Sequence, residues 1–220
     1  MDANEQGLFL ELGAVAEEPF QAAPMDTTEC EGVPCEENDA SVLAAIERNL
    51  GYVPNNLIRV AAMHVSAEHG HEPAVLQLYP LRNCMDAYKK HERAYIEPFP
   101  TTFWLASTEL KEKVSVLEGM GYVEIFTDRL EANATYRQAM EDAHKNYADL
   151  RWGLLTSRDI AIVASKHWER ALKDVGIAGI RNRASVKCLH THYAHYLATG
   201  DNLVGAWVHE ALQELQVQMK

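Results

Sequence analysis

The distribution of charge divides this chain into two parts before any secondary structure is considered. Residues 1–39 contain eleven acidic side chains and no lysine or arginine. Residues 40–220 contain the remaining 21 of the 32 acidic residues together with all 20 basic ones. An acidic segment with scattered proline and glycine cannot bury enough apolar surface to offset the entropy of ordering it. We therefore predict a disordered acidic tail over 1–39 and a single folded domain over 40–220.

The tail contains one short apolar stretch, which offers an alternative to simple disorder. Leu8, Phe9, Leu10 and Leu12 lie close together and could form a docking segment. A protein partner bound through the acidic tail is therefore one of the expectations from the sequence.

Charge and hydropathy also argue against several classes of protein. The domain over 40–220 is nearly neutral, whereas nucleic-acid binding depends on lysine and arginine that neutralise phosphates, so no nucleic acid is expected. No run of about 18 apolar residues is present, so no membrane span is expected. The N-terminus lacks a basic region ahead of an apolar stretch, so we expect a cytoplasmic protein with free thiols.

Apolar periodicity places strands in the first half of the domain and helices in the second. We predict strands near 57–65, 74–79 and 101–105, the first two as a hairpin, because these stretches are β-branched and apolar and are bounded by turn residues. Helical spacing predicts helices at 41–50, 108–119, 129–152, 158–174, 186–199 and 203–218. Strands followed by helices indicate an α+β fold, with a small antiparallel sheet of about three strands packed on four to five helices.

A cysteine and several histidines gather in the segment 186–195, which we predict to be helical. At 100° per residue, Cys188, His192 and His195 fall within about 60° of one another, away from the apolar arc of this helix. His190 points away from this stripe unless the helix begins later in the sequence. The stripe therefore faces either solvent or a polar site.

One chemistry that suits this stripe is metal binding. Thiolate sulfur and imidazole nitrogen are ligands that zinc prefers, and three ligands from one helix would be strained. We therefore predict Cys188 and His192 as ligands, completed by His69 and His71 from the turn between the first two strands. Zinc or another divalent transition metal is the expected cofactor.

The other chemistry is nucleophilic or acid–base catalysis. Cys188 would then be the nucleophile and His192 its base, with His190 and His195 as further acid–base candidates. The remaining alternative is a set of partly exposed histidines beside a buried structural thiol.

The loop ahead of this helix, 176–187, is rich in glycine and basic residues. Arg181, Arg183 and Lys187 precede a helix N-terminus, where free N–H groups and the helix dipole favour an anion. We therefore predict these three residues as anion-binding, although the spacing does not fit a phosphate-binding P-loop. The alternative is an ordinary connection with solvated arginines.

On the long helix at 129–152, three charged or titratable residues repeat every seven positions. Arg137, His144 and Arg151 lie beside the apolar stripe, with acidic residues between them. This pattern indicates a solvated face whose charges pair with one another.

Several motifs occur in one order along the chain. They are PFPTTFWL at 98–105, VSVLEG at 114–119, GIAG at 176–179, VKCLHTHYAH at 186–195 and GDNLVG at 200–205. With these motifs the chain resembles the bacterial family called domain of unknown function 501, over roughly 42–208. The resemblance implies a small cytosolic protein of unassigned activity. Genes of this family often lie beside an exopolyphosphatase gene, which hints at phosphate chemistry.

The resemblance also bears on the site. Members of the family carry a cysteine in the turn before the second strand and another just after the PFPT strand. His69 and Ser107 take these two places here, whereas Cys188 and His190 match the family motif. If the family site is a metal held by cysteines, this chain keeps one thiolate, and His69 would substitute for another.

Two functional hypotheses follow. The first is an enzyme that acts on a small anionic or phosphorylated substrate at a Cys/His site, with or without a metal, beside the basic loop. The second is a non-catalytic protein-interaction module with a structural Cys/His cluster and a regulatory acidic tail.

Overall fold

The structure is a computed structural model that describes residues 40–83, 96–183 and 185–218. The tail predicted over 1–39 lies outside the described residues, as does Cys84. Within the described residues, no helix combines the length and apolar character needed to cross a membrane. The elements, in chain order, are α1 (Ala40–Leu50), β1 (Leu57–Ser66), β2 (Gly70–Leu78), β3 (Leu81–Asn83), β4 (Ile96–Pro98), β5 (Phe103–Leu105), α3 (Thr108–Gly119), α4 (Tyr122–Ala132), α5 (Ala134–Gly153), α6 (Ser157–Ser165), α7 (Glu169–Lys173), the 3₁₀ turn η1 (Ile177–Gly179), α8 (Leu189–Thr199) and α9 (Leu203–Gln218).

The main sheet has three antiparallel strands in the order β1-β2-β5. β1 and β2 form the expected hairpin, with Ser66 opposite Gly70 and Leu57 opposite Leu78. β5 pairs with the other edge of β2. The short strands β3 and β4 form a separate two-stranded sheet. An α+β fold with a small antiparallel sheet and a following layer of helices is therefore confirmed.

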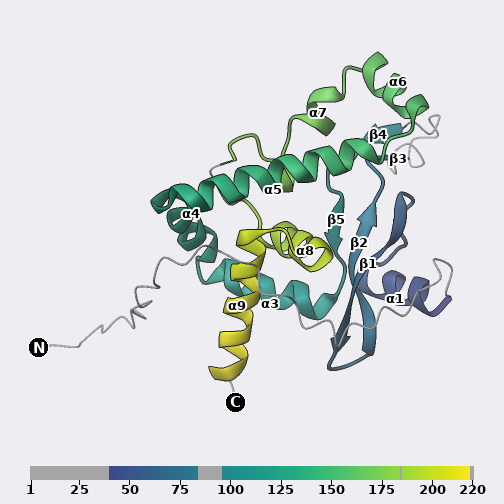
Figure 1. Cartoon of the computed structure of the whole chain (residues 1–220). Helices are drawn as coiled ribbons and strands as arrows, with labels where there is room; N and C mark the ends of the chain where they lie inside the picture. Colours follow the sequence, from purple (N-terminus) through teal and green to yellow (C-terminus); the bar gives the residue numbers. More distant parts are fainter. Residues whose placement is uncertain (1–39, 84–95, 184, 219–220) are drawn as a thin grey trace, which may run out of the picture. The chain divides into compact units, whose positions relative to one another are not determined.

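The central strand β2 is buried on both faces because helices pack against each of them. Val75 belongs to the larger apolar core, which the sheet shares with α3, α4, α5, α8 and α9. The next residue, Leu76, points the opposite way, as strand alternation requires, and packs with Ile46 of α1. Figure 1 shows α1 and α8 on opposite sides of the sheet.

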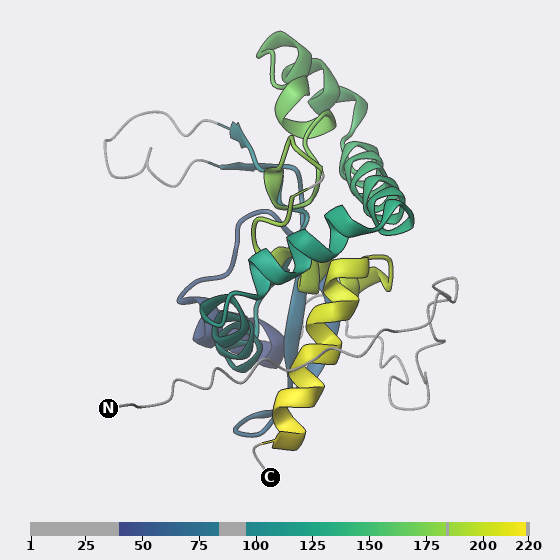
Figure 2. The same cartoon turned by 90° about the vertical axis from the view of Figure 1, so that its left-hand side faces the viewer.

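Helix α8 occupies the middle of the helical layer and contacts both β5 and α9. Figure 2 shows α9 in front of the strands of the sheet. α3 also packs against α8 and α9, so residues of α3 and the start of α8 meet although they are far apart in sequence.

Three of the predicted helices have different boundaries in the structure. The stretch 129–152 is interrupted at Asn133, whose extended backbone and side chain cap α5 by accepting from the amides of Thr135 and Tyr136. The stretch 158–174 is interrupted at His167, which adopts a positive φ of 57° between α6 and α7. The helix predicted over 186–199 begins only at Leu189.

The face of α5 that was predicted to be solvated is buried at two of its three positions. Arg151 has no exposed surface and donates to the carbonyl oxygens of Leu172 (2.6 Å), Val175 (2.5 Å) and Pro100 (3.0 Å). His144 is also buried. The prediction failed because three segments distant from Arg151 in the chain supply its carbonyl partners: α7, the connection after α7 and the residues before β5. Helical periodicity does not reveal such partners.

Candidate functional site

The start of helix α8 brings a thiol and an imidazole together. Cys188 is the N-cap residue, with extended backbone angles (φ −150°, ψ 116°), and His190 lies in the first turn. The Sγ atom of Cys188 lies 3.8 Å from Nδ1 of His190. Thr191 donates a further hydrogen bond to this sulfur over 3.8 Å. The later start of the helix thus pairs Cys188 with His190 rather than with the predicted stripe.

Helix α3 adds a carboxylate to this pair. Oε1 of Glu118 accepts a hydrogen bond from the backbone N–H of Leu189 (2.7 Å) and lies 3.2 Å from Nδ1 of His190. A carboxylate is favoured there because the first N–H groups of a helix have no partner within the helix and carry partial positive charge. Glu118 therefore caps α8 and also enters the site.

The second ring nitrogen of His190 is fixed by α3. Nε2 lies 3.1 Å from the carbonyl oxygen of Lys111 and 3.2 Å from Oγ of Ser115. A carbonyl oxygen can only accept, so Nε2 carries the hydrogen. In the neutral ring Nδ1 consequently presents its lone pair toward Cys188 and Glu118.

The electrostatics of the site favour a deprotonated thiol. The hydrogen bond with Cys188, supported by the charge of Glu118, raises the pKa of His190 to about 9 in spite of burial. Burial alone would raise the pKa of Cys188, but the hydrogen bonds from His190 and Thr191 outweigh it, and the thiol pKa lies below its ordinary value. Without a metal, these contacts therefore shift the pair toward a thiolate beside an imidazolium.

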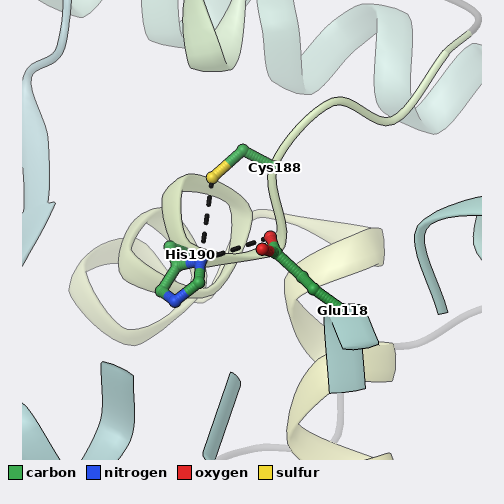
Figure 3. Close-up of side chains that lie close together, drawn as sticks. All are labelled: Glu118, Cys188 and His190. Carbon is green, nitrogen blue, oxygen red and sulfur yellow. Dashed lines mark hydrogen bonds and ion pairs between the residues drawn. The ribbon is translucent and has the colours of Figure 1, made fainter. Parts of the chain in front are cut away.

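The ligand atoms of Glu118, Cys188 and His190 all lie within 4.8 Å of one another. Figure 3 shows the sulfur and the carboxylate approaching the same nitrogen of His190. All three residues are half-buried, so part of the site is exposed to solvent. This arrangement can hold a divalent metal ion through one oxygen, one sulfur and one nitrogen, or it can activate the thiolate as a nucleophile.

His192 and His195 lie in the core and not beside Cys188. Nδ1 of His192 lies 3.3 Å from Oδ1 of Asn202, and Nδ1 of His195 lies 3.1 Å from the amide nitrogen of Asn202. Burial lowers the pKa of His192 to about 3 and that of His195 to about 4, so both rings are neutral. The predicted stripe does not form because Cys188 precedes the helix instead of lying on it.

The turn between β1 and β2 does not join the cluster. His69 and His71 are exposed, and Nε2 of His69 lies 3.8 Å from a carboxylate oxygen of Glu68. Among the described residues, the cluster of three metal-ligating groups includes neither histidine. Ser107 instead donates to the buried carboxylate of Glu72 over 2.8 Å.

The basic loop separates into one paired and two exposed residues. Arg183 forms an ion pair with Glu141, with 2.6 Å between Nη1 and Oε1. Arg181 and Lys187 are exposed, and Lys187 directly precedes Cys188 in the chain. The position next to the first amides of α8 is occupied by the Glu118 carboxylate.

Sequence reasoning missed Glu118 as a site residue. The signal that could have found it is the spacing of Lys111, Ser115 and Glu118 on α3, at i, i+4 and i+7. These three positions share one helical face, and all three contact the start of α8.

The fold and the site together define an α+β protein with a half-buried Glu/Cys/His cluster between two helices. A family model described as a protein of unknown function (DUF501) matches residues 64–210, so the chain belongs to this family. The matched range includes all three residues of the cluster. No curated protein and no solved structure matches the chain.

Proposed function

We propose that this chain is a metal-dependent enzyme that holds one divalent transition-metal ion with Glu118, Cys188 and His190. The observation that carries the proposal is that two acceptors, the sulfur of Cys188 and an oxygen of Glu118, approach the same nitrogen of His190. A single N–H at Nδ1 can satisfy only one of them fully, whereas a cation between the three atoms satisfies all of them.

The distances support this interpretation. Zinc binds sulfur at about 2.3 Å and nitrogen or oxygen at about 2.0–2.2 Å, so a tetrahedral site separates sulfur from nitrogen by about 3.6 Å and nitrogen from oxygen by about 3.4 Å. The corresponding separations here are 3.8 Å and 3.2 Å. The hydrogen bond from Nε2 of His190 to the Lys111 carbonyl is the outer contact that usually orients a metal-binding histidine.

Three protein ligands leave a fourth position for water or substrate, which is typical of catalytic zinc sites. Zinc there would supply a Lewis acid and a bound water with a pKa of about 7. The charges of the thiolate and the Glu118 carboxylate balance a divalent cation, so the centre would not repel an anion. The exposed Lys187 and Arg181 favour a small anionic substrate, such as a phosphate or carboxylate compound.

Metal content of the untagged full-length protein tests the proposal. We expect close to one zinc or similar ion per chain, and loss of most of it in Cys188→Ser and Glu118→Gln. The matched control is the double variant His69→Asn/His71→Asn, which should keep its metal because these exposed histidines lie outside the cluster. Equal metal in wild type and Cys188→Ser, or no uptake after addition of zinc, would overturn the proposal.

Cobalt substitution provides a second measurement for the case in which zinc is lost on purification. A thiolate ligand adds a sulfur-to-cobalt charge-transfer band, which Cys188→Ser should abolish and the double histidine variant should retain. Protein that binds metal is then screened for hydrolysis of small phosphate and carboxylate esters.

A second candidate function is thiol-dependent catalysis without a metal. It is favoured by the lowered pKa of Cys188 at a helix N-cap. In this case the metal-free protein should be alkylated by iodoacetamide faster than a free thiol at pH 7, and His190→Gln should remove the excess rate. An ordinary alkylation rate would exclude this candidate.

A further inference from the structure

A cavity of about 240 Å³ lies where β1, α3, α8 and α9 meet, and it shares no residue with the Glu118–Cys188–His190 cluster. This volume is slightly below the range of about 300–1,000 Å³ that is usual for ligand pockets. Apolar side chains from three of these elements, Met63, Leu110 and Leu212, form part of the wall. The cavity therefore suits a molecule smaller than a drug-sized ligand.

A chain of hydrogen bonds ends at this cavity with a free donor. The amide nitrogen of Gln213 lies 3.0 Å from Nε2 of His209, and because an amide nitrogen only donates, this ring nitrogen accepts. The ring hydrogen is consequently on Nδ1, which donates to the hydroxyl oxygen of Tyr193 over 3.3 Å. Within the described part of the chain, the Tyr193 hydroxyl hydrogen has no acceptor.

A second polar atom beside the cavity faces a carboxylate and is closed off from solvent. Nε2 of His64 is buried and forms no hydrogen bond with any described residue. A carboxylate oxygen of Glu109 lies 3.6 Å from it, but this carboxylate is already engaged by Lys113 (2.6 Å) and by the amide of Ala67 (2.9 Å). This nitrogen has almost no accessible surface, so a ligand in the cavity would not reach it, and the Tyr193 hydroxyl supplies the polar contact.

The hydrogen-bonded chain from Gln213 through His209 to Tyr193, called the relay below, is uncharged near neutral pH. Burial raises the pKa of Tyr193 to about 12 and lowers that of His209 below its ordinary value. The hydroxyl therefore acts as a neutral donor, and an ionised ligand head group has no advantage at this end of the cavity.

We infer that this cavity is a binding site for a small uncharged carbonyl compound that carries an apolar ring. The carbonyl oxygen accepts from the Tyr193 hydroxyl. The ring occupies the space between Met63, Leu110 and Leu212. This inference is independent of the proposed metal site.

Benzamide is the probe that tests the inference, with binding to the full-length protein followed by ligand-observed NMR titration. Tyr193→Phe removes one neutral hydrogen bond and should weaken binding roughly two- to tenfold. Gln213→Glu changes an exposed residue and reverses the direction of the relay. The new carboxylate accepts from Nε2 of His209, so Nδ1 of His209 becomes an acceptor. The Tyr193 hydroxyl then donates to Nδ1 and no longer offers its hydrogen to a ligand. We expect this variant to weaken binding to a similar extent.

Two exposed positions on β1 provide a matched pair of variants. Met63 (43% exposed) lines the cavity, whereas Val65 (61% exposed) lies two residues along the same strand and does not. Met63→Trp should fill the cavity and abolish benzamide binding, and Val65→Trp should leave it unchanged. Absence of binding at millimolar benzamide, or equal effects of the two tryptophan variants, would overturn the inference. Removal of metal with a chelator should not alter benzamide binding. The outcome of this test is therefore independent of whether the proposed metal site exists.

Discussion

Acidification should destabilise this fold because three histidines are buried in it without charge. Burial lowers the pKa of His144 to about 4, that of His192 to about 3 and that of His195 to about 4. The neighbouring Arg183 further disfavours the charged form of His144, whereas Asp201 favours the charged form of His195 without offsetting its burial. All three rings therefore stay neutral in the folded protein down to about pH 5.

The sign and size of the effect follow from proton linkage. Because the pKa is lowered in the folded state, the unfolded chain binds more protons than the folded chain below the ordinary pKa of 6.5. The stability that these histidines contribute is therefore fully present above pH 6.5 and is lost as the pH falls. Between pH 6.5 and pH 5, a span of 1.5 pH units, each histidine lowers the free energy of unfolding by about 1.4 kcal/mol per pH unit. The loss at pH 5 is therefore about 2 kcal/mol per histidine. Three histidines give about 6 kcal/mol. His190, whose pKa is raised, stabilises the fold at low pH and offsets about 1 kcal/mol of this loss.

Urea unfolding followed by circular dichroism at pH 7.5, 6.0 and 5.0 measures the effect on the metal-free protein. We expect the free energy of unfolding to fall by about 5 kcal/mol between pH 7.5 and pH 5. His195→Asn removes one titrating ring, so its loss over the same interval should be about 2 kcal/mol smaller. The destabilisation caused by the substitution itself cancels because each protein is compared with itself. Parallel pH dependence in wild type and His195→Asn would refute the reasoning.

Three further predictions concern stability and are measured as the shift of the thermal midpoint. Arg151→Met leaves three carbonyl groups, two of them in buried hydrogen bonds, without their donor and should cost about 3–5 kcal/mol. The exposed Arg137→Met should stay within about 0.5 kcal/mol, and similar shifts in the two variants would contradict the burial of Arg151. Gly205→Ala places a Cβ 2.4 Å from a backbone oxygen and should prevent stable folding, while Gly153→Ala meets no atom within 4 Å and should be tolerated. Ser107→Ala removes the cap of α3 and a partner of a buried carboxylate, and should cost about 2 kcal/mol; an unchanged midpoint would show that neither bond matters.

The positions of most elements could be predicted from the sequence because they depend on local pattern. The hairpin within 57–79 and the helix over 203–218 were confirmed, since alternation and helical spacing are properties of neighbouring residues. The single helices predicted over 129–152 and 158–174 were wrong. A side-chain cap at Asn133 and a left-handed residue at His167 interrupt them, and periodicity alone does not detect either signal.

The candidate site was predictable only in part. Cys188 and His190 are two residues apart, so the sequence could single them out together. Glu118 lies 72 residues before His190 in the chain, and only the packing of α3 against α8 brings it to the same point. Conversely, helical spacing grouped His192 with Cys188, whereas tertiary packing places His192 in the core with Asn202.

The sequence by itself therefore determined that strands precede helices, the family and the segment that carries the thiol, because short-range pattern and composition encode these features. The tertiary structure decided which histidine faces the thiol, which carboxylate completes the cluster and which charged side chains are buried. Those outcomes depend on contacts between α3, α5, the loop after α7 and α8, and the free energy of such contacts depends on burial and on partners distant in the chain.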